Sequence, residues 1–200
     1  MWSAYRAGGR FDRIVSAGTF GVISVPSFLA ALLLVLIFAV NWHLFPLGQW
    51  ARPTAKGWAT NLRYAFLPAL TLALQEAAVF TRLLRSDMMT TLQEDYILAA
   101  RAKGMPTWHI LAREALRPSS FSLITLAGLS VGRLIGGTII VEQIFALPGL
   151  GSVIINAAQK NDYPVVQGAV LIIAIVYVLV NLAVDLFYGY LDPRIRRVRV

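Results

Sequence analysis

The chain has 200 residues, 58% of them hydrophobic, and a formal net charge of +8. Its apolar content exceeds the roughly 45–50% of an ordinary soluble domain, which indicates a membrane protein. Cysteine is absent, so the sequence excludes disulfides, thiolate metal sites and a cysteine nucleophile.

Four apolar blocks follow one another along the chain. Each is close to the roughly 20 residues that a helix needs to cross the hydrocarbon core of a bilayer. Since lipid offers no hydrogen-bond partner to the backbone, and since the blocks lack the alternation of strands, helices are expected. The sequence therefore predicts an all-α, polytopic transmembrane helical bundle in a single domain over residues 1–200. The four predicted spans cover about residues 20–40, 66–88, 119–141 and 165–190.

The arginines and lysines predict the orientation of the spans. Thirteen of the 18 precede the first span, follow the fourth, or lie between the inner end of the second span and the third. Because cytoplasmic loops are enriched in Arg and Lys, both ends of the chain and the stretch 91–118 are predicted to be cytoplasmic. This topology explains the positive charge more simply than nucleic-acid binding, which needs a basic face with base-stacking aromatics.

Two charged residues, Glu76 and Arg133, lie near the middle of predicted spans. A charge near the bilayer centre costs several kcal/mol, so both are candidates for a translocation path. Antiparallel spans would place them at similar depth, where they would form an ion pair or face shared water. The alternative is that each points into the bundle and pairs with backbone carbonyls or a partner subunit. Nearby, Gly128, Gly132 and Gly136 recur every four residues, a spacing that permits close helix packing.

The stretch 91–118 predicts two short helices. The first begins at the capping-box pattern Thr91–Glu94, or at Asp95 as a competing N-cap. Gly104 suits a left-handed helix stop, and a proline follows two residues later. A second helical stretch then runs to Pro118, which is expected to end it.

The surface of the first short helix allows two interpretations. Its small side chains would let another protein approach closely while larger ones anchor that protein. Alternatively, the segment lies on lipid headgroups as an amphipathic linker. The small residues are Ala99, Ala100 and Ala102, and the expected anchors are Tyr96, Ile97 and Arg101.

The sequence "DYILAARAKGM", followed by "LAREALRPS", resembles the EAA loop of ABC-importer permeases, in the form typical of the dipeptide, oligopeptide and nickel group. Further blocks in the family's order extend the resemblance from about Arg10 onward. They are "DRIVSAGTFGVISVPSF", "TRLLRSDMMTTL", "GGTIIVEQIFALPGLG", "DYPVVQGAVLI" and "NLAVDLFYGYLDPRIR". The resemblance implies the fold of a type I ABC-importer permease in a bacterial or archaeal cytoplasmic membrane.

Three residues of the loop depart from the general family pattern and are interpreted as features of the subgroup. Leu98 stands in place of a glutamate, Glu114 in place of an isoleucine and Arg117 in place of a proline. No role of the missing glutamate is therefore carried over. The family pattern also has a first span, an external loop and a second span before the part present here. A fragment, a truncated gene model and a naturally short paralogue all fit this difference.

The resemblance implies that the loop is a coupling helix, held in a groove of an ABC ATPase subunit. The residues expected to couple are Asp95, Tyr96, Ala99, Ala100, Arg101, Ala102, Lys103 and Gly104. The chain has no Walker A pattern, so no cofactor is expected in it and the partner subunits would bind ATP. Further expected partners are a second permease subunit in a heterodimer, membrane lipid, and an extracytoplasmic substrate-binding protein near residues 142–164, but no nucleic acid.

Neither a catalytic set nor a metal site is predicted, because His43 and His109 stand apart from other ligand-type residues. The predicted function is that of a membrane-spanning permease subunit of an ABC importer, for di- or oligopeptides or a related small solute such as nickel. The alternative is a truncated, non-transporting membrane scaffold that docks an ATPase. The exact substrate and the identity of the partner permease do not follow from the sequence of one subunit.

Overall fold

The computed structural model describes residues 1–48, 50 and 57–191, without the side chains of residues 135–137, 185 and 187–191. All regular elements in this described part are helices, which confirms the all-α prediction. The chain divides into two compact units. Unit 1 combines Met1–Ser24 with Gln75–Ala127, and unit 2 combines Val25–Leu74 with the chain from Gly128 onward.

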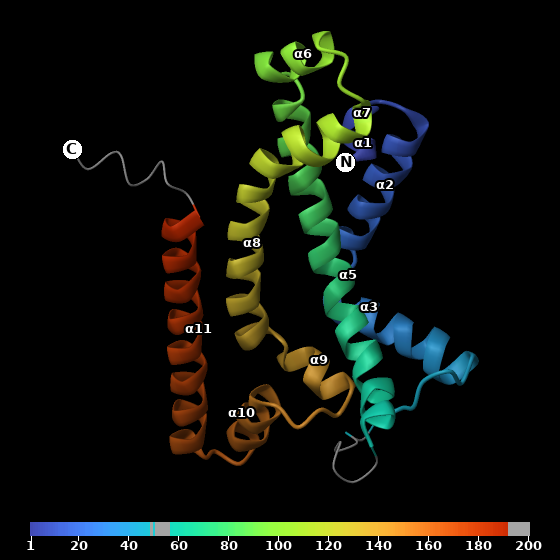
Figure 1. Cartoon of the computed structure of the whole chain (residues 1–200). Helices are drawn as coiled ribbons and strands as arrows, with labels where there is room; N and C mark the ends of the chain where they lie inside the picture. Colours follow the sequence, from blue (N-terminus) through green and yellow to red (C-terminus); the bar gives the residue numbers. More distant parts are fainter. Residues whose placement is uncertain (49, 51–56, 192–200) are drawn as a thin grey trace, which may run out of the picture. The chain divides into compact units, whose positions relative to one another are not determined.

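Unit 1 holds the predicted cytoplasmic stretch. Its elements are α1 (Trp2–Tyr5), α2 (Arg10–Ser24), the later part of α5 (Trp58–Thr91), α6 (Asp95–Ala102), α7 (Thr107–His109), the π-helix η2 (Ile110–Ala115) and the first part of α8 (Leu116–Gly137). Its core contains the fully buried side chains of Met88, Ile97 and Ala115, together with Ala4 of α1. Because short helices are stabilised mainly by tertiary packing, this cluster fixes α6 near the end of α5, where Figure 1 shows it.

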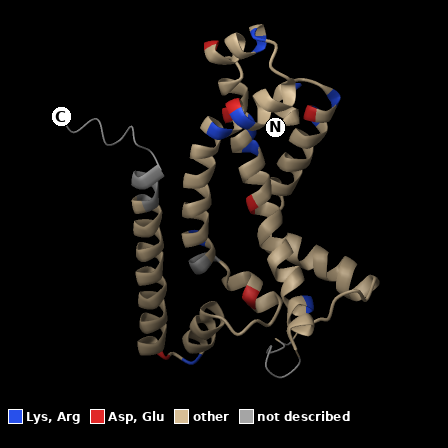
Figure 2. Ribbon diagram, in the orientation of Figure 1, with Lys and Arg blue, Asp and Glu red and all other residues tan. Residues whose placement is uncertain are grey.

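Unit 2 holds α11, the more apolar of the two long helices that could cross a membrane. Its elements are α3 (Ser27–Leu34), the π-helix η1 (Val35–Asn41), the first part of α5, the end of α8, α9 (Ile139–Ile144), α10 (Leu150–Gln159) and α11 (Tyr163–Leu191). Ala31, Leu67 and Val141 form its core with neighbouring apolar residues. Between Tyr163 and Val184, α11 has no charged residue, as Figure 2 shows, and only 6% of this stretch is buried within the chain. A helix that is apolar all round suits a bilayer.

Two helices in the described part are long and apolar enough to cross a membrane, α5 and Tyr163–Val184 of α11. A third candidate is the interrupted pair of α2 with α3 and η1. The first predicted span is therefore not one helix, since α2 ends at Ser24 and Pro26 is the N-cap of α3. Proline has no backbone N–H and disfavours the helical conformation in the preceding residue. By length and apolarity, this part of the chain has two or three candidate spans, against about four predicted.

The start of α6 differs from the prediction. Thr91 is the last residue of α5, and its hydroxyl lies 3.0 Å from the Oγ of Ser119. The N-cap of α6 is Glu94, which has an extended backbone, and Asp95 is the first helical residue. The prediction that Thr91 opens a capping box is therefore wrong, because a tertiary contact occupies its side chain.

The end of α6 agrees with the prediction, but the end of the second helical stretch does not. Gly104 has a φ of +75°, in the left-handed region that favours glycine, and follows the last turn of α6. Pro118 was expected to stop a helix, yet α7, η2 and α8 follow one another without a break. The wide turns of η2 end at Ala115, three residues before Pro118. Such π turns are one of the known ways in which a helix accommodates a local distortion.

Candidate functional site

Helix α6 has one buried and one exposed face. Ile97 and Ala100 lie in the core of unit 1, with exposed fractions of 0% and 7%. Four other residues have the spacing i, i+3, i+4 and i+7, which places them on one face of an α-helix. All four are exposed, and they are Asp95, Leu98, Ala99 and Ala102.

Two large apolar residues after the end of α6 are exposed as well. Met105 and Trp108 are also exposed, and Trp108 leaves 70% of its surface accessible, compared with 53% for Leu98. Large apolar side chains that are exposed close together in the sequence of a loop are candidates for contact with a partner. We name this set the outer surface of the loop. It consists of Asp95, Leu98, Ala99, Ala102, Met105 and Trp108.

The residues predicted to couple lie on both faces. Three belong to the outer surface, and Arg101, Lys103 and Gly104 are exposed beside it. Ala100 lies in the core instead, so it holds α6 in place and leaves almost no surface for a partner. The prediction that Ile97 is an anchor for a partner is wrong, because its side chain is fully buried.

Three members of the outer surface are not singled out by the sequence reasoning. For Leu98 a signal was available, because it shares the helical spacing of Asp95, Ala99 and Ala102. Met105 and Trp108 follow Gly104, where the helical period is interrupted. Their exposure depends on the fold of the loop and has no local signal.

Tyr96 connects α6 to the helix that follows. Its hydroxyl donates a long hydrogen bond of 3.4 Å to the backbone carbonyl of Glu114. In an α-helix this carbonyl would accept from the N–H of residue 118, but Pro118 has none. Burial, and then the negative charges of Glu94 and Glu114, raise the pKa of Tyr96 above its ordinary value. The hydroxyl therefore keeps the proton that it donates.

Helix α1 lies against the same loop. The guanidinium of Arg101 is 5.9 Å from the centre of the Tyr5 ring, within the range of a cation–π contact. The Tyr5 hydroxyl lies 3.5 Å from Oγ1 of Thr107 at the start of α7. Ala4 is buried in the cluster that also contains Ile97. The loop is thus in contact with the chain's first helix as well as with α5.

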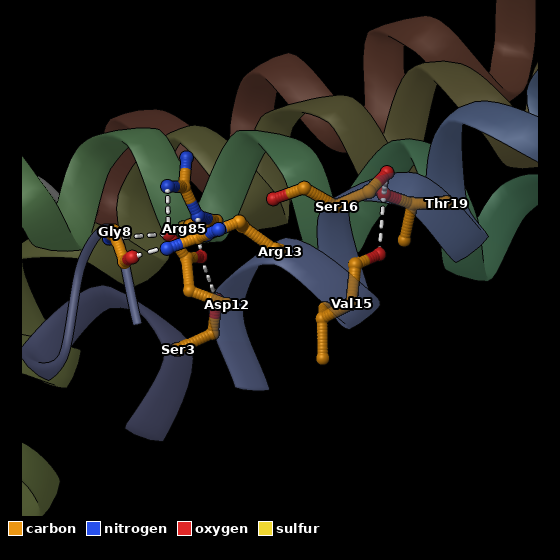
Figure 3. A network of polar contacts seen from close by, with 8 residues as sticks. All are labelled: Ser3, Gly8, Asp12, Arg13, Val15, Ser16, Thr19 and Arg85. Atoms are coloured by element: carbon orange, nitrogen blue, oxygen red, sulfur yellow. Dashed lines mark hydrogen bonds and ion pairs between the residues drawn. The ribbon is translucent and has the colours of Figure 1, made fainter. Parts of the chain in front are cut away.

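An ion pair with a buried carboxylate and a half-buried guanidinium joins α2 to α5 in unit 1. Arg85 donates from Nε and Nη2 to the two carboxylate oxygens of Asp12, at 2.6 and 2.7 Å. The carboxylate also accepts from the hydroxyl of Ser3 and from the N–H of Gly8, the latter at 2.8 Å, as Figure 3 shows. Asp12 is only 3% exposed. Both residues of the pair lie in blocks that carry the family resemblance, but nothing in the sequence joins positions so far apart.

The two charges predicted inside spans belong to different units. Glu76 is in the unit 1 part of α5, and Arg133 is in the unit 2 part of α8. Arg133 donates from Nη2 to the hydroxyl of Ser130, at 2.8 Å, one turn earlier in the same helix. The pairing of Glu76 with Arg133 stays a prediction.

The glycines of α8 allow a close approach of α11. A Cβ on Gly128 would lie 2.5 Å from a methyl group of Val184, and a Cβ on Gly132 would lie 3.1 Å from the ring of Tyr177. The predicted packing role is confirmed for these two glycines, with a helix of the same chain as the partner. The surroundings of Gly136 lie outside the described residues.

Glu142 organises the segment between α9 and α10. Its carboxylate accepts from the N–H of Ser152 in the first turn of α10, at 3.0 Å, and from the hydroxyl of Thr138, at 3.1 Å. A negative charge is favourable at a helix N-terminus, where the first N–H groups lack partners. Gly149 and Gly151 leave room for this carboxylate, because a Cβ on either residue would collide with it. In the described residues, no cluster of three or more His, Cys, Asp or Glu side chains could hold a metal ion.

Comparison with known proteins places the chain among transport components. The family of binding-protein-dependent transport system inner membrane components matches residues 1–197. The chain is 38% identical, over 97% of its length, to a putative peptide permease protein of Brucella suis biovar 1. It is 36% identical to the dipeptide transport system permease protein of Bacillus subtilis and 37% identical to that of Escherichia coli, in each case over 97% of its length. The chain covers 61%, 60% and 64% of these three relatives.

Proposed function

Since the chain belongs to the family of binding-protein-dependent transport system inner membrane components, which are transport proteins and not enzymes, we propose that it is a membrane-spanning permease subunit of an ABC importer. The relatives named above are called peptide or dipeptide permeases. We therefore propose di- or oligopeptides as the cargo, in preference to nickel. The chain spans about three fifths of the length of these relatives, and both of its units would belong to one transmembrane domain.

The outer surface of the loop is the proposed docking site for an ATPase subunit. The observation that carries this proposal is the division of α6 into two faces: Ile97 and Ala100 hold it to unit 1, while Leu98 and Ala99 are exposed. Alanines permit a close approach of the partner's backbone, and Leu98 and Trp108 supply large apolar anchors. The alternative of an amphipathic linker on lipid headgroups would also use an apolar face, and photo-crosslinking from position 98 separates the two.

The proposed mechanism uses the packing of unit 1. The partner subunits would bind and hydrolyse ATP, and their closure would move α6. Because α6 shares a core with Met88 of α5 and with Leu92 directly after it, the movement would reach this long helix without passing through a flexible joint. Displacement of α5 and its neighbours would then open the path alternately to the two sides of the membrane, as in a rocking transporter.

The distribution of charge supports a cytoplasmic position for unit 1. Most of the described Arg and Lys residues belong to unit 1, as Figure 2 shows, and few belong to unit 2. Positive charge is retained on the cytoplasmic side of membrane proteins. The terminal arginines at 194–199 lie outside the described residues. We propose a substrate-binding protein on the opposite side, near residues 142–164, and a second permease subunit beside this one in a heterodimer.

Co-purification tests the docking proposal. Tagged chain is recovered from its native membranes, together with any ATP-hydrolysing subunits that it holds. We expect the wild type to retain these subunits and Ala99→Trp and Leu98→Asp to lose them, while the variant chains stay in the membrane at wild-type levels. The matched control is Val153→Asp, an exposed apolar residue of α10 that should leave recovery unchanged. Equal recovery from all four chains would contradict docking through α6.

The non-transporting scaffold is a second candidate, because the exposed face of α6 would dock an ATPase whether or not a solute is carried. The two functions differ in uptake and not in docking. Vesicles that hold the assembled complex and its binding protein are given radiolabelled dialanine, with ATP supplied on the side of the ATPase subunits. ATP-dependent accumulation supports the importer, whereas retained ATPase subunits with no uptake of any di- or oligopeptide tested support the scaffold.

A further inference from the structure

The first helix of the chain contacts both the docking loop and α2. Ala4 and Tyr5 touch the loop, through the shared core and through Arg101 and Thr107 respectively. Ser3, the residue before them, donates its hydroxyl hydrogen bond to Asp12 of α2. A helix of four residues has too few internal hydrogen bonds to hold itself in place, so these contacts determine its position.

Asp12 of α2 completes the connection between the docking loop and α5, because it binds both Ser3 of α1 and Arg85 of α5. Its carboxylate has four donors, which are the Nε and Nη2 atoms of Arg85, the Ser3 hydroxyl and the Gly8 N–H. Gly8 has a φ of +80°, a conformation that glycine adopts without strain, and this turn directs its N–H toward the carboxylate. A two-point contact between guanidinium and carboxylate fixes orientation as well as distance.

We propose that Ser3, Ala4, Tyr5, Gly8 and Asp12, which we name the N-terminal brace, work with Arg85 to transmit movement of the docking loop to α2. The covalent chain joins α6 directly to α5, but α2 is reached through α1 and Asp12. With the brace intact, α2 and α5 move together when the loop is displaced. Without it, the turn at residues 6–9 absorbs the displacement and α2 stays behind.

The chemistry of the pair fits a role in positioning better than a role in stability. A buried ion pair contributes little net stability, because the cost of removing two charges from water offsets their attraction. Apolar side chains would hold α2 against α5 equally well, but they slide more easily than a two-point ion pair. Arg85 and Asp12 are thus positioning residues, which act on the transport path through the helices that carry them.

This inference rests on the proposed function, and its test uses the assembled transporter with its ATPase subunits. The chain has no cysteine, so a single reporter introduced as Ala17→Cys, at an exposed residue of α2, can be labelled after the cysteines of the partners have been replaced. The rate of maleimide labelling is compared between the nucleotide-free state and the state trapped with ATP and vanadate. The variant is the double substitution Asp12→Asn with Arg85→Gln, which leaves no buried charge without a partner.

The matched control is Arg10→Gln, an exposed arginine of α2 that lies outside the brace. We expect trapping to change the labelling rate in the wild type and in the control. In the double variant the labelling rate of the trapped state, divided by that of the nucleotide-free state, should move toward unity. The ATPase subunits should still be recovered. Tyr5→Ala, which cuts the brace at the loop and leaves the ion pair intact, should also move this ratio toward unity.

Other outcomes overturn the inference in distinguishable ways. A wild-type ratio in both the double variant and Tyr5→Ala would show that α2 does not depend on the brace. If the double variant fails to accumulate in the membrane, Tyr5→Ala alone decides. A wild type that recovers the ATPase but shows no change in labelling of the α2 reporter would mean that α2 does not respond to nucleotide. A wild type that recovers no ATPase would overturn the proposed function, and the brace with it.

Discussion

The carboxylate of Asp12 illustrates how single residues set the structure of unit 1. A charge that is 3% exposed is costly unless donors satisfy it, and the groups around Asp12 do so. Arg85 has an exposed side-chain fraction of 28%, so solvent can partly compensate if its partner is lost, whereas Asp12 has no such compensation. Removal of Arg85 is therefore expected to be the more harmful single change.

A double-mutant cycle on this pair tests the argument. We expect Arg85→Gln to lower the free energy of unfolding by about 3 kcal/mol, because it leaves the Asp12 charge buried without its main partner. Adding Asp12→Asn should recover much of this loss, since no charge then remains to be compensated. Thermal unfolding of the detergent-purified chain measures the loss in the single variant and the recovery in the double variant. The control Arg82→Gln is expected to change the free energy of unfolding only slightly. Additive losses in the double variant would contradict a coupled pair.

Gly104 sets the end of α6 through its backbone conformation alone. No atom lies within 4 Å of a Cβ added there, so Gly104→Ala should cost only the strain of a positive φ, about 1–2 kcal/mol. Gly104→Asn should cost less, because asparagine tolerates this conformation better. Gly18→Ala is the control, a glycine in the interior of α2 with equally free space and no positive φ, and it should be neutral or stabilising. Unfolding temperatures that fall equally for Gly104→Ala and Gly18→Ala would contradict this account.

Glu76 and Arg133 carry the proposal of a translocation path, each in its own unit. Charges within spans are costly, so a functional role is the reason to keep them. We expect Glu76→Gln and Arg133→Gln each to reduce ATP-driven uptake of labelled dialanine at unchanged chain levels. If the two residues pair, exchanging them as Glu76→Arg with Arg133→Glu should restore uptake that either single swap abolishes. Full uptake in both neutralised variants would remove both residues from the path.

At the scale of elements, the segment between α9 and α10 depends on two glycines. A Cβ on Gly149 would collide with the Glu142 carboxylate, and a Cβ on Gly151 would lie 2.8 Å from the backbone Cα of Ile139. The carboxylate is at the end of a side chain that can rotate, although rotation breaks its bond to the Ser152 N–H. A backbone atom cannot move away so easily. The clash of an alanine at position 149 could therefore be relieved by rotation of the Glu142 side chain. The clash of an alanine at position 151 would require a shift of the backbone.

We expect Gly151→Ala to destabilise the chain more than Gly149→Ala, and both more than the control Gly168→Ala in α11, which has no atom within 4 Å. In Gly149→Ala, the extra loss from Glu142→Gln should be small, because the displaced carboxylate has already lost its helix contact. Unfolding temperatures of the purified variants provide the comparison. An order in which Gly168→Ala is the most harmful would show that close packing does not govern this segment.

Two prolines show why the elements could be predicted only in part. The apolar runs of α5 and α11 are long enough to be recognised from composition. Pro26 lies inside an equally apolar run, and there its local effect prevails and α2 ends before it. Pro118 has the same local effect, yet the helix continues, because η2 adjusts the turns and the Tyr96 hydroxyl donates to the Glu114 carbonyl in place of the missing N–H. That donor comes from another helix and has no local signal.

The candidate site was predictable to a similar extent. The motif that resembles the EAA loop predicts the position of the loop, and Gly104 predicts the end of its helix. The helical spacing of the residues in α6 identifies its exposed face. Ala100 was expected to couple although it is buried, because small residues occur both in cores and at close interfaces. The pair of Asp12 with Arg85 joins residues 73 positions apart, and hydrophobic periodicity says nothing about such contacts.

At the scale of the whole molecule, the chain combines a charged, self-packed unit 1 with an apolar helix that little of its own chain covers. The exposed side chains of α11 and the outer surface of the loop differ in the charged residues beside them. No charged residue lies between Tyr163 and Val184, whereas Asp95, Arg101 and Lys103 lie on or beside the outer surface. A wholly apolar helix suits lipid, and an apolar patch with a charged rim suits a protein partner in water.

The central claim is that the outer surface of the loop contacts the ATPase. Photo-crosslinking in native membranes tests this contact most directly. A photoreactive amino acid is placed at Leu98 and, in a separate chain, at Val153 of α10, which is also exposed and apolar. We expect an adduct with an ATP-hydrolysing subunit from position 98 and none from position 153. Adducts with lipid alone from position 98, in membranes that contain the ATPase, would contradict it and assign α6 to the headgroups.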